Sequence, residues 1–415
     1  YLERVDDDYL RERAADIRDL GRRVLAHLQE DTPSTPETYP DNAILVGDEI
    51  SVAMLGEVPR DKLKGLVSVR GSSTSHVAIV ARAMGIPTVL GMVDLPLPRL
   101  NGAPVVLDGH RGRLFVRTAA ELQTRYASLI AEEKVLSEVL EHEQDLPSRT
   151  PDGHEMPLMV NTGLAVDASA LLKSRIGGVG LYRTEVPFMI TERFPGEKEQ
   201  MRMYREQLKG FAPLPVVMRT LDIGGDKDLP YFPIEEANPF LGWRGMRVTL
   251  DHPEVLMVQL RAMLKASHDL GNLYVLLPMI TNVEEVDEAI RLLDRAILEL
   301  GEEGIKVERP KVGVMIEVPA TIYQMDALAK RVDFFSVGSN DLTQYLLAVD
   351  RNNPRVSSLY DALHPALLGA LQELAQDAKR LNKPISLCGE LAGDRPGALL
   401  LMAMGFTSLS MNAPS

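Results

Sequence analysis

The chain has 415 residues, of which 45% are hydrophobic and 25% charged, so its composition is that of an average globular protein with room for two or three domains. A net charge of −14 argues against general nucleic-acid binding, because no basic surface is available to neutralise a phosphate backbone. The single cysteine excludes an internal disulfide and suits a reducing, cytoplasmic location, and no apolar run reaches the roughly 20 residues that span a bilayer.

The first third of the chain is expected to hold a helix, a linker and a small domain. Residues 5–30 have the apolar spacing of an amphipathic helix, and the proline-rich segment DTPSTPETYPD follows as a linker. From 43 to 117, short apolar runs alternate with turns, which is typical of a compact β/α domain. Residues 118–144 contain no Gly or Pro and are rich in helix formers, which predicts one long connecting helix.

From residue 157 onward, strand-like runs alternate with helical stretches. The eight strand candidates are PLMVN, GVGLYRT, PVVMRTLDIGG, VLLPMI, KVGVMIEVP, FFSVGSN, PISLCGE and SLSMN. Eight such repeats predict a (β/α)8 barrel, whose site lies at the carboxyl ends of the strands. Polar residues stand at those ends: Asn161, Arg183, Arg219, Glu317, Asn340 and Cys388. The sequence shows no closing helix after the eighth strand.

Two carboxylates, Glu317 and Asp341, follow consecutive predicted strands and are therefore expected to converge at the barrel mouth. Paired carboxylates form the hard oxygen site that Mg²⁺ prefers, with further oxygens supplied by a substrate. Helix capping or loop salt bridges would explain Asp341 alone equally well. The matching positions of the two residues favour the metal site.

Four arginines also follow apolar strands or turns: Arg183, Arg219, Arg244 and Arg351. A guanidinium binds phosphate or carboxylate through two parallel hydrogen bonds, so several of them around one mouth would bind an anion despite the overall negative charge. Any single arginine is more often part of a surface ion pair. The hypothesis of an anion site therefore depends on all four.

His76 follows the turn GSSTS and precedes the helical pattern VAIVARAMG. Free backbone N–H groups at a helix N-terminus favour phosphate, and an imidazole there could serve as a nucleophile. A capping segment with an incidental histidine explains the local pattern about as well.

Cys388 ends an apolar strand and meets Gly389 and Glu390. A buried structural cysteine is the usual interpretation, although a thiol beside an enolate could donate a proton. The segment RTLDIGGDKDLPY is a weak signal by itself, because a Gly-Gly pair often marks a turn.

Taken together, these segments resemble Enzyme I of the bacterial phosphoenolpyruvate (PEP)-dependent phosphotransferase system from about residue 5 to residue 412. GSSTSHVAIVARAMGIPTVLG is similar to the phosphohistidine signature of that family. The barrel motifs are GGVGLYRTEVPFM, RTLDIGGDKDLPY, NPFLGWRGMR, FFSVGSNDLTQYLLAVDRNN and LCGELAGD. The GSSTSH, YFPIEEANPFLGWRG and SLSMNAPS segments look more like the nitrogen-related branch than the sugar-transport branch.

The resemblance implies an α/β architecture, with a PEP-binding (β/α)8 barrel and a small swivelling phosphohistidine domain joined by a long linker helix. It implies these boundaries: 1–32 for the last helix of a carrier-docking subdomain, 33–117 for the phosphohistidine domain, 118–148 for the linker helix and 149–415 for the barrel. By the same resemblance, parts of the family's docking subdomain and its last barrel helix would lie beyond the two ends of this chain.

The resemblance also implies a role for each site residue. His76 would accept the phosphoryl group of PEP, and Cys388 would protonate the enolpyruvate that leaves. The residues implied to bind PEP are Arg183, Arg219, Arg244, Asn340 and Arg351, and those implied to hold Mg²⁺ are Glu317 and Asp341. The implied partners are an HPr-like phosphocarrier protein and a second copy of the barrel, as a cytoplasmic homodimer, with neither a nucleic acid nor a membrane as a partner.

Three alternatives compete with this interpretation. A pyruvate,phosphate dikinase or PEP synthase would require an ATP-grasp domain, and no such segment is present in this sequence. A catalytically silent sensor is disfavoured because the motif residues are intact. A PEP-binding barrel without transfer activity, such as a lyase, would have no use for the GSSTSH segment.

Overall fold

The computed structural model describes residues 39–50, 54–55, 58–70, 77, 81, 85–92, 95–109, 111–143, 146–163, 171–172, 175–189, 191, 193–225, 227, 229, 231–353 and 355–412. The helix predicted over residues 5–30 and the candidate nucleophile His76 lie outside these ranges. The described residues divide into two compact units on either side of the boundary between His142 and Glu143. The finer domain boundaries expected from the sequence remain predictions. No described helix is long and apolar enough to cross a membrane.

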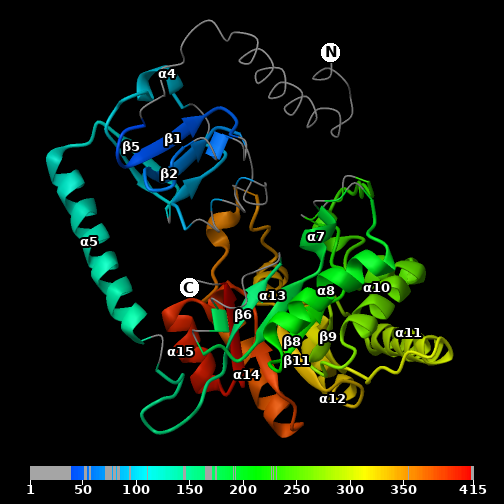
Figure 1. Cartoon of the computed structure of the whole chain (residues 1–415). Coiled ribbons are helices and arrows are strands. Elements are labelled where there is room, and N and C mark those ends of the chain that lie inside the picture. The colour runs from blue at the N-terminus through cyan, green and yellow to red at the C-terminus, as the bar shows by residue number, and fades with distance from the viewer. Residues whose placement is uncertain are drawn as a thin grey trace, which may run out of the picture. The chain divides into compact units, whose positions relative to one another are not determined.

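The first unit contains a small parallel sheet and a hairpin (Figure 1). The sheet order is β1 (Ala43–Gly47), β2 (Leu63–Ser68) and β3 (Thr88–Val89), and the hairpin joins β4 (Val105–Asp108) to β5 (Arg113–Val116). A short helix, α4 (Leu97–Leu100), precedes β4. Leu63 and Leu66 of β2 pack with the helical residues Val77 and Ala81 in the core of this unit. The sequence therefore correctly predicted a β/α domain here.

The long helix α5 (Ala120–Glu143) ends the first unit and falls within the connector predicted over 118–144. Tyr126 ties it to the hairpin, because its hydroxyl donates a hydrogen bond to Asp108 Oδ2 over 2.8 Å. Ile130 and Val135 are exposed at 64% and 60%. Intrinsic helix propensity, more than burial of an apolar face, therefore stabilises this segment.

The second unit is a closed barrel of eight parallel strands, as the sequence predicted. In chain order they are β6 (Leu158–Thr162), β7 (Val179–Arg183), β8 (Val216–Arg219), β9 (Leu273–Leu277), β10 (Lys311–Ile316), β11 (Phe334–Val337), β12 (Ile385–Leu387) and β13 (Ser408–Asn412). Pairing of β13 with β6 closes the barrel, with Asn412 opposite Asn161.

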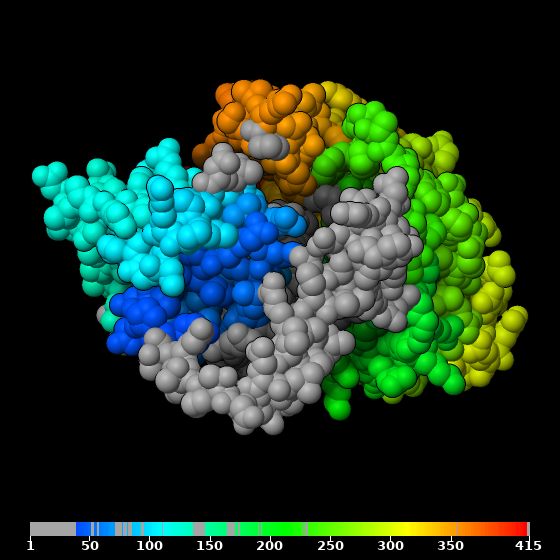
Figure 2. Space-filling view, turned by 90° about the horizontal axis from the view of Figure 1, so that it is seen from above, coloured from blue at the N-terminus to red at the C-terminus, as the bar shows by residue number. Residues whose placement is uncertain are grey.

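Helices follow the strands and cover the barrel. They are α7 (Glu185–Met189), α8 (Glu197–Phe211), α9 (Met246–Asp251), α10 (Pro253–Ala266), α11 (Val283–Glu302), α12 (Met325–Leu328), α13 (Ser339–Leu347), α14 (Pro365–Arg380) and α15 (Arg395–Met404). Short 3-10 turns occupy the connections: η2 (Pro239–Leu241), η3 (Pro319–Gln324), η4 (Ser357–Leu359) and η5 (Glu390–Ala392). Helices α8, α10 and α11 lie side by side and form one surface of this unit, green to yellow in Figure 2.

Successive residues along the barrel strands belong to two different hydrophobic cores. Leu181, Val217, Leu276 and Met315 form one cluster, whereas their neighbours along each strand belong to the main cluster shared with the helices. Because successive strand residues point to opposite faces, the first cluster fills the barrel interior and the second packs under the helices. Cys388 belongs to the interior cluster, at the end where the polar residues gather.

Candidate active site at the carboxyl ends of the barrel strands

The predicted barrel-site residues lie at or just beyond the carboxyl ends of strands, as expected. Arg183 and Arg219 are the last residues of β7 and β8, and Glu317 and Cys388 directly follow β10 and β12. The others lie on the connections that follow: Asn340 and Asp341 in the first turn of α13, Arg244 just before α9, and Arg351 after α13. Parallel strands direct all of these connections to one end of the barrel, which is why residues far apart in sequence meet there.

A buried cluster of charged side chains fills this end of the barrel. We call it the charge cluster, and its members are Glu185, Arg219, Asp222, Lys227, Arg244, Glu317 and Asp341. Arg219 pairs with Glu185 and, over 2.9 Å, with Asp222 Oδ2. Lys227 also pairs with Asp222. The fully buried Asp222 carboxylate therefore contacts three cations: Arg219 at the end of β8, and Lys227 and Arg244 on the connection that follows.

Arg244 joins Asp222 to the predicted metal ligand Asp341. Its Nη1 and Nη2 donate to the two carboxylate oxygens of Asp341 over 3.2 and 2.9 Å, and its Nε lies 3.4 Å from Asp222 Oδ1. The side chain has no exposed surface, and the Phe240 ring lies 5.9 Å from its guanidinium carbon. The pair with Asp341 has the fork geometry in which guanidinium and carboxylate form two parallel hydrogen bonds.

Burial and neighbouring charges shift the pKa values of the two predicted metal ligands in opposite directions. Burial first, and then the negative charges of Asp341 and Asp222, raise the pKa of Glu317 to about 7. Burial alone would also raise the pKa of Asp341, but the adjacent Arg244 guanidinium outweighs it and holds that pKa below its usual range. A cation beside them would favour the charged form of both carboxylates.

Glu317 has one carboxylate oxygen fixed by the backbone and one directed past a glycine. Its Oε1 accepts a hydrogen bond from the Met279 amide over 2.6 Å. A Cβ added to Gly338 would lie 2.9 Å from Oε2, so a side chain at this position would crowd the oxygen. Among the described residues, no group of three or more Asp, Glu, His or Cys is placed to hold a metal. Two buried carboxylates are nevertheless a donor set that suits Mg²⁺, which takes its remaining ligands from water and substrate.

A cavity of about 300 Å³ at the carboxyl ends of the strands brings two further predicted residues together. Arg183 and Cys388 line it, with Asn161 on β6 and Glu390 in η5. Burial lowers the pKa of Arg183 and raises that of the Cys388 thiol, and the two groups also interact electrostatically. A protonated thiol and a guanidinium thus face the same small volume, which would hold a small anion next to a proton donor.

Asn340 and Arg351 lie at the edge of this region. The side-chain oxygen of Asn340 accepts a hydrogen bond from the Glu390 amide over 3.0 Å, which links the α13 connection to the β12 connection. Arg351 donates its backbone N–H to Gln344 Oε1 over 3.0 Å, and its charge lowers the pKa of Asp341. Both residues therefore lie beside the same carboxylate end of the barrel.

Sequence reasoning missed three members of the charge cluster: Glu185, Asp222 and Lys227. Asp222 and Lys227 lie in the segment RTLDIGGDKDLPY, which was too weak a signal by itself. The spacing of Asp222 was a useful signal, because this carboxylate lies three residues after Arg219 and pairs with it just beyond the end of β8. The Nε of Arg219 and the Oε2 of Glu185 are buried without a hydrogen-bond partner among the described residues, so both groups could still bind a ligand.

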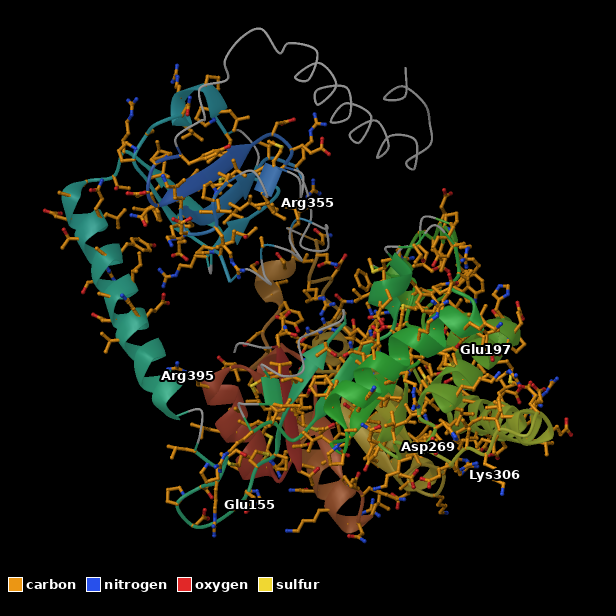
Figure 3. The ribbon with its side chains drawn as sticks, viewed as in Figure 1. Glu155, Glu197, Asp269, Lys306, Arg355 and Arg395 are labelled. Carbon is orange, nitrogen blue, oxygen red and sulfur yellow. The ribbon has the colours of Figure 1, made fainter. Side chains whose placement is uncertain are left out.

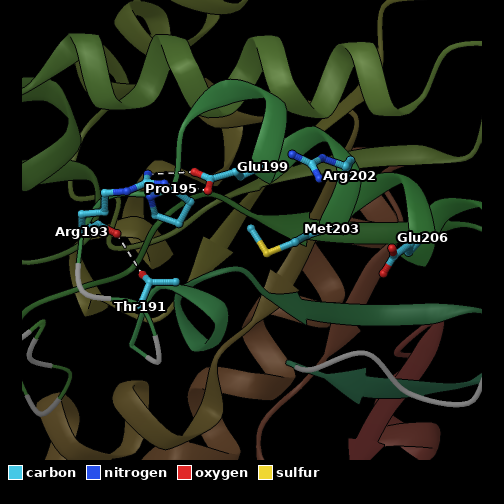
Figure 4. A pocket seen from close by; sticks show the side chains of 7 residues that line it. All are labelled: Thr191, Arg193, Pro195, Glu199, Arg202, Met203 and Glu206. Carbon is cyan, nitrogen blue, oxygen red and sulfur yellow. Dashed lines mark hydrogen bonds and ion pairs between the residues drawn. The ribbon is translucent and has the colours of Figure 1, made fainter.

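A larger hollow, about 730 Å³, opens elsewhere on the barrel unit beside the start of α8 (Figure 4). Thr191, Arg193, Pro195 and residues of α8 line it. Both guanidinium Nη atoms of Arg193 already donate to Glu199, over 2.8 and 2.7 Å. None of the site residues predicted from the sequence contributes to this hollow.

The fold and site define a two-unit chain whose barrel gathers buried arginines, carboxylates and a thiol at the carboxyl ends of its strands. Two family models match it: "PEP-utilising enzyme, PEP-binding domain" over residues 137–415 and "PEP-utilising enzyme, mobile domain" over residues 39–112. The chain belongs to the family of PEP-utilising enzymes.

Curated relatives cover nearly the whole chain. A Salmonella typhimurium protein named "Phosphoenolpyruvate-dependent phosphotransferase system" is 49% identical over 99% of this chain, and a Staphylococcus carnosus "Phosphoenolpyruvate-protein phosphotransferase" is 37% identical over all of it. The chain spans 55% of the first relative and 72% of the second. A solved "N-terminal domain of Enzyme 1 - Nitrogen" is 40% identical over 31% of this chain and 52% of that chain, with a TM-score of 0.22.

Proposed function

We propose that this chain transfers the phosphoryl group of PEP to His76 and then to a histidine of a small HPr-like carrier protein, with release of pyruvate. The observation that carries the proposal is the convergence of Arg183, Arg219 and Cys388 with the Glu317–Asp341 carboxylates at one end of the barrel. His76 lies outside the described residues, and its role is supported by the GSSTSH motif within the matched mobile domain.

In this proposal the arginines position the phosphate and the carboxylates hold a cation. Arg183 and Arg219 bind phosphate oxygens, with Arg244, Asn340 and Arg351 completing the PEP site. Glu317 and Asp341 hold Mg²⁺, which when bound would stabilise negative charge on the phosphoryl and enolate oxygens. This role fits two buried carboxylates whose negative charges lie close enough to act on each other.

The chemistry then needs one nucleophile and one proton donor. A ring nitrogen of His76 forms a bond to phosphorus as the bond between phosphorus and the enol oxygen of PEP breaks. The enolpyruvate that leaves takes the Sγ proton of Cys388 onto its methylene carbon and becomes pyruvate. Because burial raises the pKa of Cys388, the thiol retains this proton at neutral pH until the enolate forms beside it.

Three finer proposals follow from the same family resemblance. The carrier belongs to the nitrogen-related branch, the protein acts in the cytoplasm, and the barrel forms a homodimer. Pull-down with the nitrogen-branch and sugar-branch carriers would test the first. Sedimentation of the purified chain would test the last.

The decisive experiment is incubation with ³²P-PEP and Mg²⁺ of the wild type, His76→Ala and the control His110→Ala, which removes the other histidine of the mobile-domain match. Acid-labile, base-stable label on the wild type and His110→Ala, but not on His76→Ala, is the expected result. Label on none of the three despite measurable PEP binding would contradict transfer and leave a PEP-binding barrel.

A further inference from the structure

Asp341 has both carboxylate oxygens engaged by a cation of the protein itself. The Arg244 fork donates to Oδ1 and Oδ2 over 3.2 and 2.9 Å, and the Asp341 side chain is only 10% exposed. A metal ion that binds Asp341 must therefore compete with Arg244 for these oxygens. Arg244 cannot turn to water as an alternative partner, because its side chain has no exposed surface.

The same constraint applies to Arg244 as a ligand for phosphate. Its two terminal nitrogens are directed at Asp341, and its remaining contacts with Asp222, over 3.4 and 3.5 Å, are long. A phosphate that binds Arg244 draws on the same guanidinium whose two terminal nitrogens now donate to Asp341. The bidentate contact with Asp341 is therefore the interaction that either ligand weakens.

The surrounding backbone allows the guanidinium little freedom to avoid this competition. Added Cβ atoms at Gly224 and Gly225 would lie 3.1 Å from the Cα and 3.2 Å from the Cδ of Arg244, so both turns pack closely against it. The Phe240 ring lies 5.9 Å from the guanidinium carbon. Arg244 can exchange partners within this slot but cannot withdraw into solvent.

We propose that the Arg244–Asp341 ion pair is an interlock that couples metal binding to phosphate binding in the barrel. A divalent cation on Asp341 releases Arg244 for the anion, and an anion on Arg244 releases Asp341 for the cation. By thermodynamic linkage each ligand then raises the affinity for the other by the same factor. This inference rests on the proposed function, since it takes Asp341 as a metal ligand and Arg244 as a phosphate ligand.

Calorimetric titration of the full chain with Mg²⁺ alone, with inorganic phosphate alone, and with each in the presence of the other tests the interlock. In the wild type we expect each ligand to raise the affinity for the other by about fivefold or more, the lower range of typical coupling between sites. A direct contact between the bound metal and the bound phosphate would also make each ligand raise the affinity for the other. Substitution of Arg244 separates the two explanations.

Arg244→Gln removes the competitor for Asp341 and should bind Mg²⁺ alone about fivefold more tightly than the wild type, with much of the coupling lost. Lys227→Gln is the matched control, because it removes a nearby positive charge that pairs with Asp222 and Glu185 and acts on Asp341 only through its charge. We expect its Mg²⁺ affinity to rise less than that of Arg244→Gln. Arg244→Lys retains the charge without the fork, so it should show the Arg244→Gln effect in reduced form, and it decides the question if Arg244→Gln fails to fold.

Equal or weaker Mg²⁺ binding by Arg244→Gln than by Lys227→Gln would overturn the interlock and leave the proposed function standing. The same holds if Mg²⁺ and phosphate bind the wild type independently. Wild-type protein that binds neither ligand would overturn both proposals.

Discussion

Cys388 shows how a single residue is adjusted by the strand beside it. Its thiol donates to the Val337 carbonyl over 3.5 Å and accepts from the Ser336 hydroxyl over 3.5 Å, and both partners belong to β11. Burial raises the thiol pKa, whereas the hydrogen bond from Ser336 lowers it. Ser336 therefore keeps the thiol more acidic than burial alone would allow.

Ser336→Ala should raise the Cys388 pKa further. Alkylation by iodoacetamide requires the thiolate, and Cys388 is the chain's one cysteine, so the rate of modification reports this residue alone. The pH profile of that rate, measured from about pH 7 to pH 10, should move to higher pH in Ser336→Ala. Ser386→Ala is the control, because its hydroxyl hydrogen-bonds to Phe335 instead. A profile in Ser336→Ala that coincides with the wild type would contradict this role.

Gly245 occupies a backbone conformation that other residues adopt only with strain, with φ at 57° and ψ at −124°. An added Cβ would lie 2.8 Å from Met279 Cγ and 3.1 Å from Asp222 Oδ1. Gly245→Ala should lower the free energy of unfolding by about 1–3 kcal/mol and weaken phosphate binding, because the adjacent Arg244 would be displaced. Urea unfolding and phosphate calorimetry measure the two effects.

Gly301→Ala is the matched control for this substitution. Gly301 lies inside α11, and an added Cβ would meet nothing within 4 Å. Because alanine is favoured over glycine in helices, the free energy of unfolding of this variant should rise by up to about 1 kcal/mol. Its affinity for phosphate should equal that of the wild type. Equal stabilities of the two variants would refute the argument from backbone conformation.

At the scale of elements, one arginine of α10 joins three helices on the barrel surface. Arg261 contacts Glu197 at the start of α8, labelled in Figure 3, over 2.8 Å, and it contacts Glu299 over 3.1 Å in α11. Just past the end of α11, Glu303 lies 2.5 Å from it. The Arg261 side chain is 13% exposed, so solvent screens these ion pairs less than it does at an open surface.

Arg261→Ala should lower the free energy of unfolding by about 1–2 kcal/mol, because three carboxylates lose a shared and largely buried partner. Arg291→Ala removes an exposed pair with Glu288 within α11 and should change stability by less than about 0.5 kcal/mol. Urea unfolding of both variants gives the comparison. Equal losses would mean that the network contributes no more than an isolated surface pair.

At the scale of the whole molecule, the two units have separate cores. The first unit has a small cluster around Leu63 and Leu66, whereas the barrel unit has an extensive core beneath its helices. Two such cores are expected to unfold in separate transitions. The charge cluster and the 300 Å³ cavity belong entirely to the barrel unit.

Scanning calorimetry should therefore show two transitions, of which Mg²⁺ with phosphate raises only the one that belongs to the barrel. At concentrations about 100 times the dissociation constant, binding would add about 2.7 kcal/mol to the stability of that unit. Asp341→Asn should abolish the shift, because it removes a proposed metal ligand. An equal shift of both transitions would contradict a site confined to the barrel.

Much of this fold could be predicted from the sequence, because each barrel strand is an apolar run that ends in a turn or a polar residue. Arg183, Arg219, Glu317 and Cys388 could be placed at the carboxyl ends of strands without coordinates, because in a parallel barrel the strand order alone dictates that position. Asp222 could have been found from its spacing to Arg219, but no local period connects Asp222 or Lys227 to Arg244.

The sequence by itself determined the eight strand–helix repeats, the long helix after the small domain and the set of polar residues that meet at one end of the barrel. These follow from periodicity and from residue type, which are local properties. Only the tertiary structure decided that Arg219 and Arg244 are already paired with buried carboxylates. Arg244 and Asp341 are 97 residues apart, and only closure of the barrel, which excludes water from both side chains, makes each the other's partner.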